Sequence, residues 1–359
     1  MNIKSLLIGS AAALVAVSGA RAADAIVAAE PEPVEYVRVC DAFGTGFFYI
    51  PGTETCLKID GYVRFRVTAS KGTSEYQQNT RARLNFDARS ETELGTLRGY
   101  IRFQSNSGGV NGDANVVQDQ AMLQLGGLFM GYTESAFAAL WGGGVGNFGI
   151  IQTDNGGIYA YQQTQQIGYR YDAGAFYAAL VLENDLVPGA ATSAARGDWA
   201  PDVVGVLGMT QGWGGADVRI AYDESAKAVG VKGLVEVAVA ATGGSLRVGM
   251  FYNNKVGNRY GVGLPGGAAG ETANWSAGLG YTQDVTETVN ATLGYQYFDG
   301  FSAANGGTTK TAHLVEGALS WTPVTNFNVR LEGNYGWNKS NANVNTTTAS
   351  GFVWVRRSF

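Results

Sequence analysis

Arginine recurs at alternate positions in three neighbouring segments of the chain, a spacing that could build a charged surface. Residues two apart in a β-strand point to the same face, so the arginines of each segment would share one face. A wall of like charge along an aqueous passage sets its electrostatic bias. The members of this predicted wall are Arg64, Arg66, Arg81, Arg83, Arg98 and Arg102. Alternatively, these charges pair locally with Asp60, Asp87 and Glu91, and each interpretation can hold for different members.

Side chains suited to catalysis do not form a recognisable constellation. His313 is the only histidine, so a Ser-His-Asp triad would have to use it. Glu316 and Glu332 could imitate the paired acids of a glycosidase, but a wide, wet interior would not raise the pKa of either carboxyl group. The glycines of 144–149 match a dinucleotide fingerprint in spacing, yet they do not join a strand to a helix. We therefore expect no enzymatic activity, no cofactor and no metal site.

The two cysteines, Cys40 and Cys56, are sixteen positions apart in an aromatic, glycine-rich segment. In an exported protein they meet an oxidising compartment, which favours a disulfide over two free thiols. Closing a loop of this size would stabilise the fold by about 3 kcal/mol. The sequence has no Cys-x-x-Cys motif, which leaves a redox role without support.

The N-terminus has the features of a secretory signal peptide over residues 1–22. Lys4 supplies a positive start, 6–17 is apolar, and 20–22 fits a small-x-small cleavage site. Removal of this segment takes two basic residues (25 − 2 = 23) and leaves the 30 acidic ones, a net charge of −7. Nucleic-acid binding would require a basic excess, so we expect no nucleic-acid partner. The acidic, proline-containing residues that follow belong to a predicted periplasmic linker and disulfide-containing cap over 23–56.

From residue 57 onward the chain alternates apolar and polar residues with a period of two. One face of each predicted strand must contact lipid and the other water, because no window after the signal peptide is apolar enough for a helical span. An arginine on the lipid face at mid-bilayer costs about 2–4 kcal/mol, so the arginine-bearing faces must point inward. The predicted strands cover 57–68, 80–91, 95–105, 117–126, 128–137, 163–172, 175–184, 203–210, 216–224, 229–239, 245–254, 273–283, 288–299, 311–322, 326–338 and 349–359.

These segments predict an all-β fold, a sixteen-stranded antiparallel transmembrane barrel over 57–359. Short turns alternate with longer polar or glycine-rich connections, except at 225–228, which is short where a long one is due. Barrels of this kind have short periplasmic turns and long extracellular loops, so both ends of the chain would lie in the periplasm. The last strand ends in Phe359, a terminal aromatic typical of barrels delivered to the outer membrane by the barrel-assembly machinery.

Three stretches carry a resemblance to a known family. Residues 34–66, which include both cysteines and the sequence from Gly61 to Arg64, closely resemble the alphaproteobacterial general porins of Brucella and related Rhizobiales. The start of the chain, 1–7, and the segment 131–135 are similar to the same family, and the resemblance covers essentially the whole chain. The resemblance implies a homotrimer in the bacterial outer membrane, in contact with lipid and lipopolysaccharide. It also implies passive diffusion of small hydrophilic solutes past a third loop folded into the lumen.

The matching loop is roughly 138–162, a glycine-rich connection that would form the constriction with the arginine wall. Loops of related porins present several acids, whereas Asp154 is the only one here, which predicts a wider or less polarised opening. Tyr159 and Tyr161 are the other loop residues expected at the constriction. Two alternatives remain: a substrate-specific oligosaccharide channel, for which Tyr62 and Tyr100 would extend an aromatic track, and a plugged structural or adhesive barrel.

Overall fold

The computed structural model describes residues 38–108, 115–184, 200–255, 257–266, 271–300, 310–340 and 345–359. The expected signal peptide, 1–22, and the residues that follow it up to 37 lie outside these ranges. From Val39 onward the chain forms a single compact unit. No helix among the described residues is long and apolar enough to cross a membrane.

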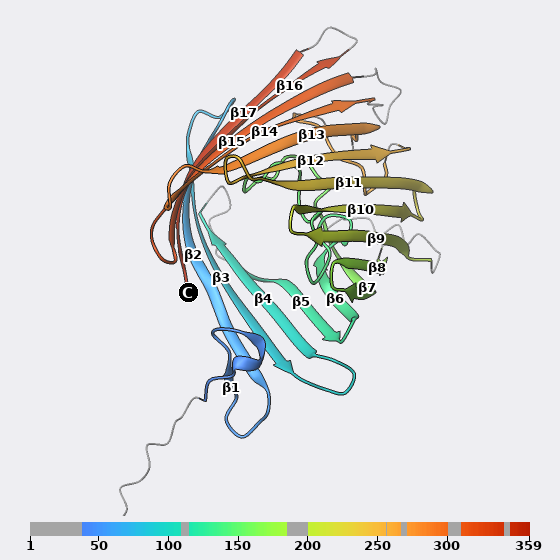
Figure 1. Ribbon diagram of the computed structural model, residues 1–359. Helices are drawn as coiled ribbons and strands as arrows, with labels where there is room; N and C mark the ends of the chain where they lie inside the picture. Colours follow the sequence, from blue (N-terminus) through green and yellow to red (C-terminus); the bar gives the residue numbers. More distant parts are fainter. Residues whose placement is uncertain are drawn as a thin grey trace, which may run out of the picture. The chain divides into compact units, whose positions relative to one another are not determined.

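Antiparallel strands, each hydrogen-bonded to the next along the chain, build a closed barrel (Figure 1). The first strand, β1 (Phe48–Tyr49), only extends the edge of β2, so the ring has sixteen of the seventeen strands. The predicted all-β barrel is therefore confirmed. The ring consists of β2 (Cys56–Ser70), β3 (Gln77–Ser90), β4 (Leu97–Ser107), β5 (Asn115–Leu125), β6 (Leu128–Glu134), β7 (Gln163–Ala173), β8 (Phe176–Glu183), β9 (Asp202–Gln211), β10 (Gly214–Asp223), β11 (Ala228–Val239), β12 (Gly244–Asn253), β13 (Trp275–Asp284), β14 (Val289–Asp299), β15 (Lys310–Val324), β16 (Phe327–Ser340) and β17 (Asn345–Ser358).

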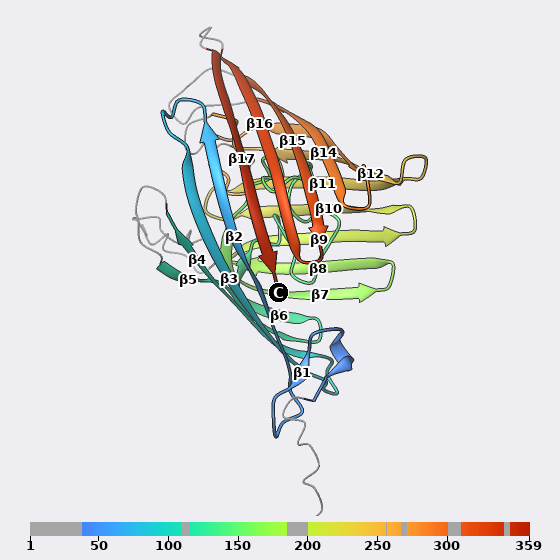
Figure 2. The ribbon, with the colours of Figure 1, turned by 90° about the vertical axis from the view of Figure 1, so that its left-hand side faces the viewer.

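The ring closes where β17 pairs with β2 (Figure 2). The last residue takes part in this closure: Phe359 and Gly61 exchange two backbone hydrogen bonds, each of 3.1 Å. A side chain at Gly61 would lie 2.1 Å from the Arg83 carbonyl oxygen and 3.2 Å from the Phe359 ring. Glycine is thus required where the terminal aromatic lies against β2, and the barrel has no open edge.

The two faces of the strands differ as the alternation predicts. On β2 and β3 the apolar residues Val63, Phe65 and Leu84 are exposed on the outside, whereas Arg64 and Asp87 are buried on the inside. This arrangement keeps charge out of a surrounding hydrocarbon layer. The polar faces of the strands therefore line the lumen.

The strand boundaries agree with the prediction to within a few residues. The largest difference is at β17, which begins at Asn345 instead of 349, and another, at β6, changes the course of the chain. We predicted a strand over 128–137, but β6 ends at Glu134. The amides of Ala138 and Ala139 both donate to the Ser135 carbonyl, at 2.9 and 2.8 Å, so the chain turns there instead of continuing. This early turn starts the long connection between β6 and β7.

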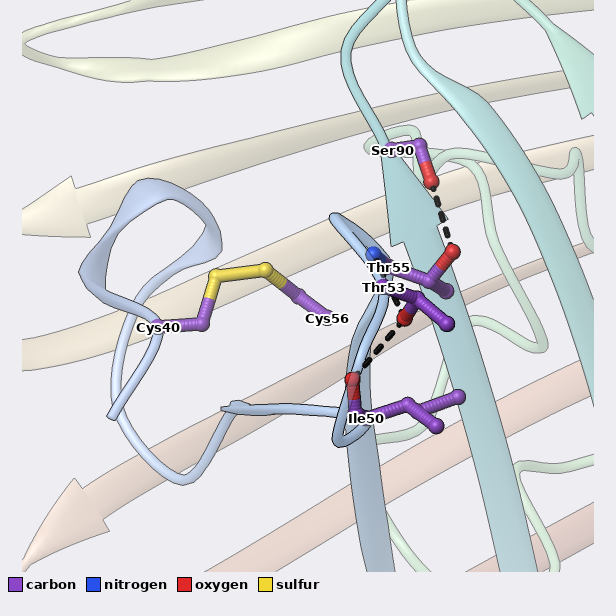
Figure 3. The surroundings of a disulfide bond; sticks show 6 residues. All are labelled: Cys40, Ile50, Thr53, Thr55, Cys56 and Ser90. Carbon is purple, nitrogen blue, oxygen red and sulfur yellow. Dashed lines mark hydrogen bonds between the residues drawn. A yellow bond between two sulfur atoms is a disulfide. The ribbon is translucent and has the colours of Figure 1, made fainter. Parts of the chain in front are cut away.

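The N-terminal cap is held at the start of β2 by the disulfide Cys40–Cys56, which confirms that prediction (Figure 3). Both cysteines are buried beside Phe47, and Arg89 of β3 lies 5.0 Å from the centre of the Phe47 ring. Thr55 Oγ1 lies 3.2 Å from Ser90 Oγ, which also links the cap to β3. The cap is therefore attached to the barrel by a covalent bond and by packing.

The inside–outside assignment can be tested with a matched pair of substitutions on β16. Leu331 is exposed on the outer face and Asn334 faces inward. We expect Leu331→Arg to lower the free energy of unfolding in lipid by about 2–4 kcal/mol, because it places a charge in hydrocarbon. Asn334→Arg should change it by about 0.5 kcal/mol, since the lumen is wet. Equal losses in urea titrations of the two variants would contradict the assignment.

Candidate constriction site

The connection between β6 and β7, residues 135–162, folds into the barrel, where the green segment lies within the ring of strands (Figures 1 and 2). We call it the constriction loop. Its course follows from its contacts, because inward side chains of β8 to β16 bind its backbone one after another. The predicted inward fold of 138–162 is thus seen, with the loop beginning slightly earlier at Ser135.

The loop leaves β6 at a fully buried carboxylate. Glu183 of β8 accepts hydrogen bonds from Ser135 Oγ, at 3.0 Å, and from the Ala136 amide, at 2.7 Å. Arg219 of β10 is also fully buried; its guanidinium pairs with Asp217 at 2.8 Å and donates to the Ala136 carbonyl at 2.8 Å. Buried charges that satisfy backbone groups in this way fix the loop in one position, because removal of either partner leaves the other unpaired.

Two more basic side chains of the wall hold the middle of the loop, which also packs against glycines of the strands. Lys232 of β11 donates to the Phe148 carbonyl, and Arg247 of β12 donates to the Gly149 carbonyl at 3.0 Å. Beyond them Ile150 and Ile151 lie against the wall. A side chain at any of three wall glycines would come within 2.9 Å of these isoleucines, namely Gly249, Gly280 and Gly294. The glycines therefore let the loop approach the strands.

The tip of the loop is bound by the two glutamates that could have suggested a glycosidase. Glu332 of β16 accepts from the amides of Asp154, at 2.7 Å, and Asn155, at 2.9 Å. Glu316 of β15 accepts from Thr153 Oγ1 and from the Gly157 amide. Both oxygens of Glu332 and Oε2 of Glu316 accept hydrogen bonds from the loop, so both side chains act as anchors in this structure.

The predicted arginine wall lies on β2, β3 and β4, across from the loop tip. Arg64 meets Asp154 at 3.3 Å, the contact expected between wall and loop. Arg66 donates to Thr68 Oγ1 at 3.1 Å, and Arg81 donates to Asn106 Oδ1 at 2.7 Å. Among the described residues, no carboxylate lies within ion-pair distance of Arg66 or Arg81.

The other three wall arginines are paired with acids. Arg83 and Arg102 lie 3.5 and 3.6 Å from Asp119, and Arg102 lies 3.9 Å from Glu134. Arg98 forms a two-point pair with Asp87, at 2.8 Å for both contacts. Of the three acids considered as local partners of the wall, Asp87 does pair with a wall arginine, Arg98. The other two have different partners: Glu91 accepts a hydrogen bond from Thr96, and Asp60 accepts one from Asn85.

Asp119 reaches the wall because β5 is irregular at this residue. Arg102 of β4 pairs with Gln120 and the next residue, Phe103, with Gln118, so Asp119 is the extra residue of a bulge. A bulge redirects a side chain relative to simple alternation. Asp119 and Glu134 add negative charge to the site that sequence reasoning had attributed to Asp154 alone.

Sequence reasoning also missed the inner face of β17. Phe352 and Trp354 are buried, and they pair across β2 with the inward residues Thr68 and Arg66. The Arg66 guanidinium lies 3.7 Å from the centre of the Phe352 ring, a distance typical of a cation–π contact. Phe352 thus supports Arg66 of the wall, and Trp354 lies beside Arg356, whose guanidinium is 4.9 Å from its ring centre.

A second loop, between β12 and β13, also enters the lumen. Its Tyr260 is buried, with the ring 5.4 Å from Phe137 of the constriction loop and the hydroxyl 3.0 Å from Glu183. Its Arg259 pairs with Asp202 at 3.0 Å. The two loops are thus in contact with each other and share the carboxyl group of Glu183.

The tyrosines of the constriction loop carry no charge at neutral pH. Burial, with Glu134, Asp154 and Glu316 nearby, raises the pKa of Tyr159 to about 12. Burial also raises the pKa of Tyr161. Asp154 is therefore the charged side chain that the loop presents to the wall, and these phenols give no reason for conductance to vary between pH 5 and 9.

The anchoring of the loop tip can be tested by replacing Glu332 with alanine. Each hydrogen bond to a buried carboxylate contributes about 1.5–3 kcal/mol, so the amides of Asp154 and Asn155 should exchange hydrogen at least about tenfold faster. The Ile158 amide, which donates to Gln296 at 3.0 Å, serves as an internal control and should keep its rate. Unchanged exchange at Asp154 and Asn155 would show that Glu332 does not hold the tip.

Comparison with known proteins places this architecture in a family. The family model described as "Porin subfamily" matches residues 24–353. Porin Omp2b of Brucella suis biovar 1 (strain 1330) is 46% identical over 246 residues, which cover 62% of this chain and 66% of the relative. Porin Omp2b of Brucella canis is 45% identical over the same length. These matches span just under two thirds of the relatives.

Solved structures share the fold at low sequence identity. The outer membrane channel DcaP of Acinetobacter baumannii has a TM-score of 0.68 and 16% identity, over 87% of this chain and 99% of that one. The anion-selective porin from Comamonas acidovorans has a TM-score of 0.57 and 14% identity, over 85% and 100%. At these identities the likeness concerns the fold alone. Because the family model matches nearly the whole sequence, the chain belongs to the porin subfamily, whose members are proteins of the bacterial outer membrane.

Proposed function

We propose that this protein is an outer-membrane porin, a water-filled pore for the passive diffusion of small hydrophilic solutes and ions. The observation that carries the proposal is the constriction loop, which is held inside a closed sixteen-stranded barrel opposite a wall of arginines. A barrel of this strand number encloses an aqueous channel rather than a side-chain core. The loop limits solute size, and passive diffusion requires no cofactor, energy source or catalytic group.

The charges at the constriction favour anions. The wall contributes five arginines here, against three carboxylates: Arg64 pairs with Asp154, and Arg83 and Arg102 pair with Asp119 and Glu134. Arg66 and Arg81 are the members without an acidic partner among the described residues. Fixed cations that remain uncompensated attract anions into a narrow passage.

Reversal potentials in planar bilayers across a KCl gradient test both the pore and its bias. We expect conductance steps and a potential that favours chloride. A unit charge about 7 Å from an ion in water contributes about 0.6 kcal/mol, so Arg66→Gln with Arg81→Gln should lower the chloride preference about threefold or more. Arg357→Gln, which removes an exposed charge from the outward face of β17, is the control. Absence of conductance from folded protein would refute the pore.

We further propose a homotrimer, whose contact face is the outside of β17, β2, β3 and β4. Tyrosine and tryptophan concentrate where barrels meet lipid head groups. The described outward residues of these four strands include no tyrosine or tryptophan. By contrast, exposed tyrosines and a tryptophan mark the outer face elsewhere, at Tyr169, Tyr171, Tyr222, Tyr252, Trp321 and Tyr335. The face without tyrosine and tryptophan is suited to a neighbouring subunit, and the rest to lipid and lipopolysaccharide.

A matched pair of tryptophan substitutions tests the trimer face. Ala82 points outward from β3, and Ala178 points outward from β8. Ala82→Trp should shift unheated protein from trimer to monomer in gel electrophoresis and in light scattering, because added volume disrupts a packed interface. Ala178→Trp should remain trimeric. If both variants stay trimeric, or if the unmodified protein is monomeric, the proposed face is wrong.

Two further assignments belong to this proposal. Phe359 would serve as the signal read by the barrel-assembly machinery, since its ring is exposed at the closing seam while its backbone is bonded to Gly61. Residues 1–22 would act as the export signal. We do not favour a plugged structural barrel, because both lumenal loops bind along the walls through many specific contacts and leave Tyr161 and Phe148 exposed.

A further inference from the structure

Three aromatic rings of the constriction loop form a continuous strip. The ring centres of Phe148 and Tyr159 are 6.4 Å apart, and those of Tyr159 and Tyr161 are 6.1 Å apart, both edge-to-face. Tyr159 is half-buried against the loop, whereas Phe148 is 49% exposed and Tyr161 is 53% exposed. We call these three residues the aromatic strip. Large apolar rings that remain open to water inside a channel are available to a passing solute.

The backbone presents the strip at an energetic cost. Phe148 has φ of 66° and Ala160, between the two tyrosines, has φ of 58°, a left-handed conformation that side-chain-bearing residues rarely adopt. Phe148 is held there because its amide donates to the Ala138 carbonyl at 2.8 Å and its carbonyl accepts from Lys232. Strained residues of this kind cluster where a binding surface must be displayed.

The polar groups beside the strip are balanced in charge. The charged groups acting on Tyr161 are Glu134, Asp119 and Arg83. With Arg102, they form a group of two guanidiniums and two carboxylates joined by contacts of 3.5 to 3.9 Å. Such a group offers both donors and acceptors but no net charge. A charged ligand therefore gains no net electrostatic attraction from this group. A neutral solute with several hydroxyls can bond to both the donors and the acceptors.

We propose that the aromatic strip is a binding subsite for neutral, ring-shaped, polyhydroxylated solutes, that is, monosaccharides or short oligosaccharides. The apolar face of a pyranose would pack on Phe148 or Tyr161, and its hydroxyls would bond to Asp119, Glu134 and the two arginines. The inference rests on the proposed pore function and adds a preferred solute class to it. We expect the subsite to slow and concentrate such solutes where they pass the constriction loop.

The strip differs from the aromatic track considered from sequence. Tyr62 and Tyr100 are not part of it, because guanidiniums lie over their rings: Arg83 at 5.2 Å from Tyr62 and Arg98 at 5.2 Å from Tyr100. Phe148 takes their place. The site is therefore a short platform on the constriction loop and does not run along the barrel wall.

The test is the reduction of single-channel KCl current by maltotriose, titrated against a polyethylene glycol of equal hydrodynamic size. We expect maltotriose to reduce the current with saturation and the glycol to reduce it only in proportion to viscosity. Tyr161→Ala should raise the apparent dissociation constant for maltotriose about two- to tenfold, the value of one lost aromatic contact. Phe148→Gly should raise the dissociation constant by a similar factor, and glycine adopts the positive φ of residue 148 without strain.

Two control variants separate the ring from other effects. Tyr161→Phe keeps the platform and should retain the affinity for maltotriose. Tyr76→Ala removes an exposed tyrosine from the connection between β2 and β3 and should behave as the unmodified protein. If the sugar and the glycol reduce current equally, or if Tyr161→Ala and Phe148→Gly leave the dissociation constant unchanged, the subsite is refuted while the pore stands. Absence of any current would instead refute the proposed function.

Discussion

The structure depends on one constraint, that backbone amides and carbonyls find no hydrogen-bond partner in hydrocarbon. A sheet that crosses a membrane must therefore close on itself, and this chain does so down to its last residue. The paired hydrogen bonds between Phe359 and Gly61 complete the ring that β17 and β2 form. Once the ring is closed, every strand has a lipid side and a lumenal side, and the alternation of residue types follows.

The lumenal side of the strands also positions the constriction loop, because it can bury ionisable side chains that lipid would not accept. Arg219, Lys232 and Glu183 are fully buried, yet each binds backbone of the constriction loop. Each charge is stabilised by a partner that the loop supplies, and the loop is stabilised by charges that the wall supplies. This mutual dependence explains how a glycine-rich segment keeps a defined position inside the barrel.

Sequence patterns predicted the features that are local or periodic. The barrel, the inward arginines and the disulfide all follow from alternation or from cysteines in an exported chain. The sequence pattern did not reveal which face of β17 points to the lumen. Phe352 and Val353 are both apolar, although only Phe352 faces inward. The inward position of Tyr260 depends on Glu183, which lies 77 positions earlier, and no local pattern carries that information. Likewise, Glu332 was identified as lumenal, but its binding of the loop tip is a long-range contact.

The manner in which the wall holds the loop has a consequence for how such a channel can change. Most anchors, from Ala136 to Asn155, are main-chain groups, which every residue type except proline supplies in full. The side chains on the open side of the loop, such as Phe148 and Tyr161, carry little of this attachment. The attachment of the loop and the surface that it presents to the lumen therefore depend on different groups. Side chains on the open side can be substituted one by one without loss of the main-chain contacts that position the loop.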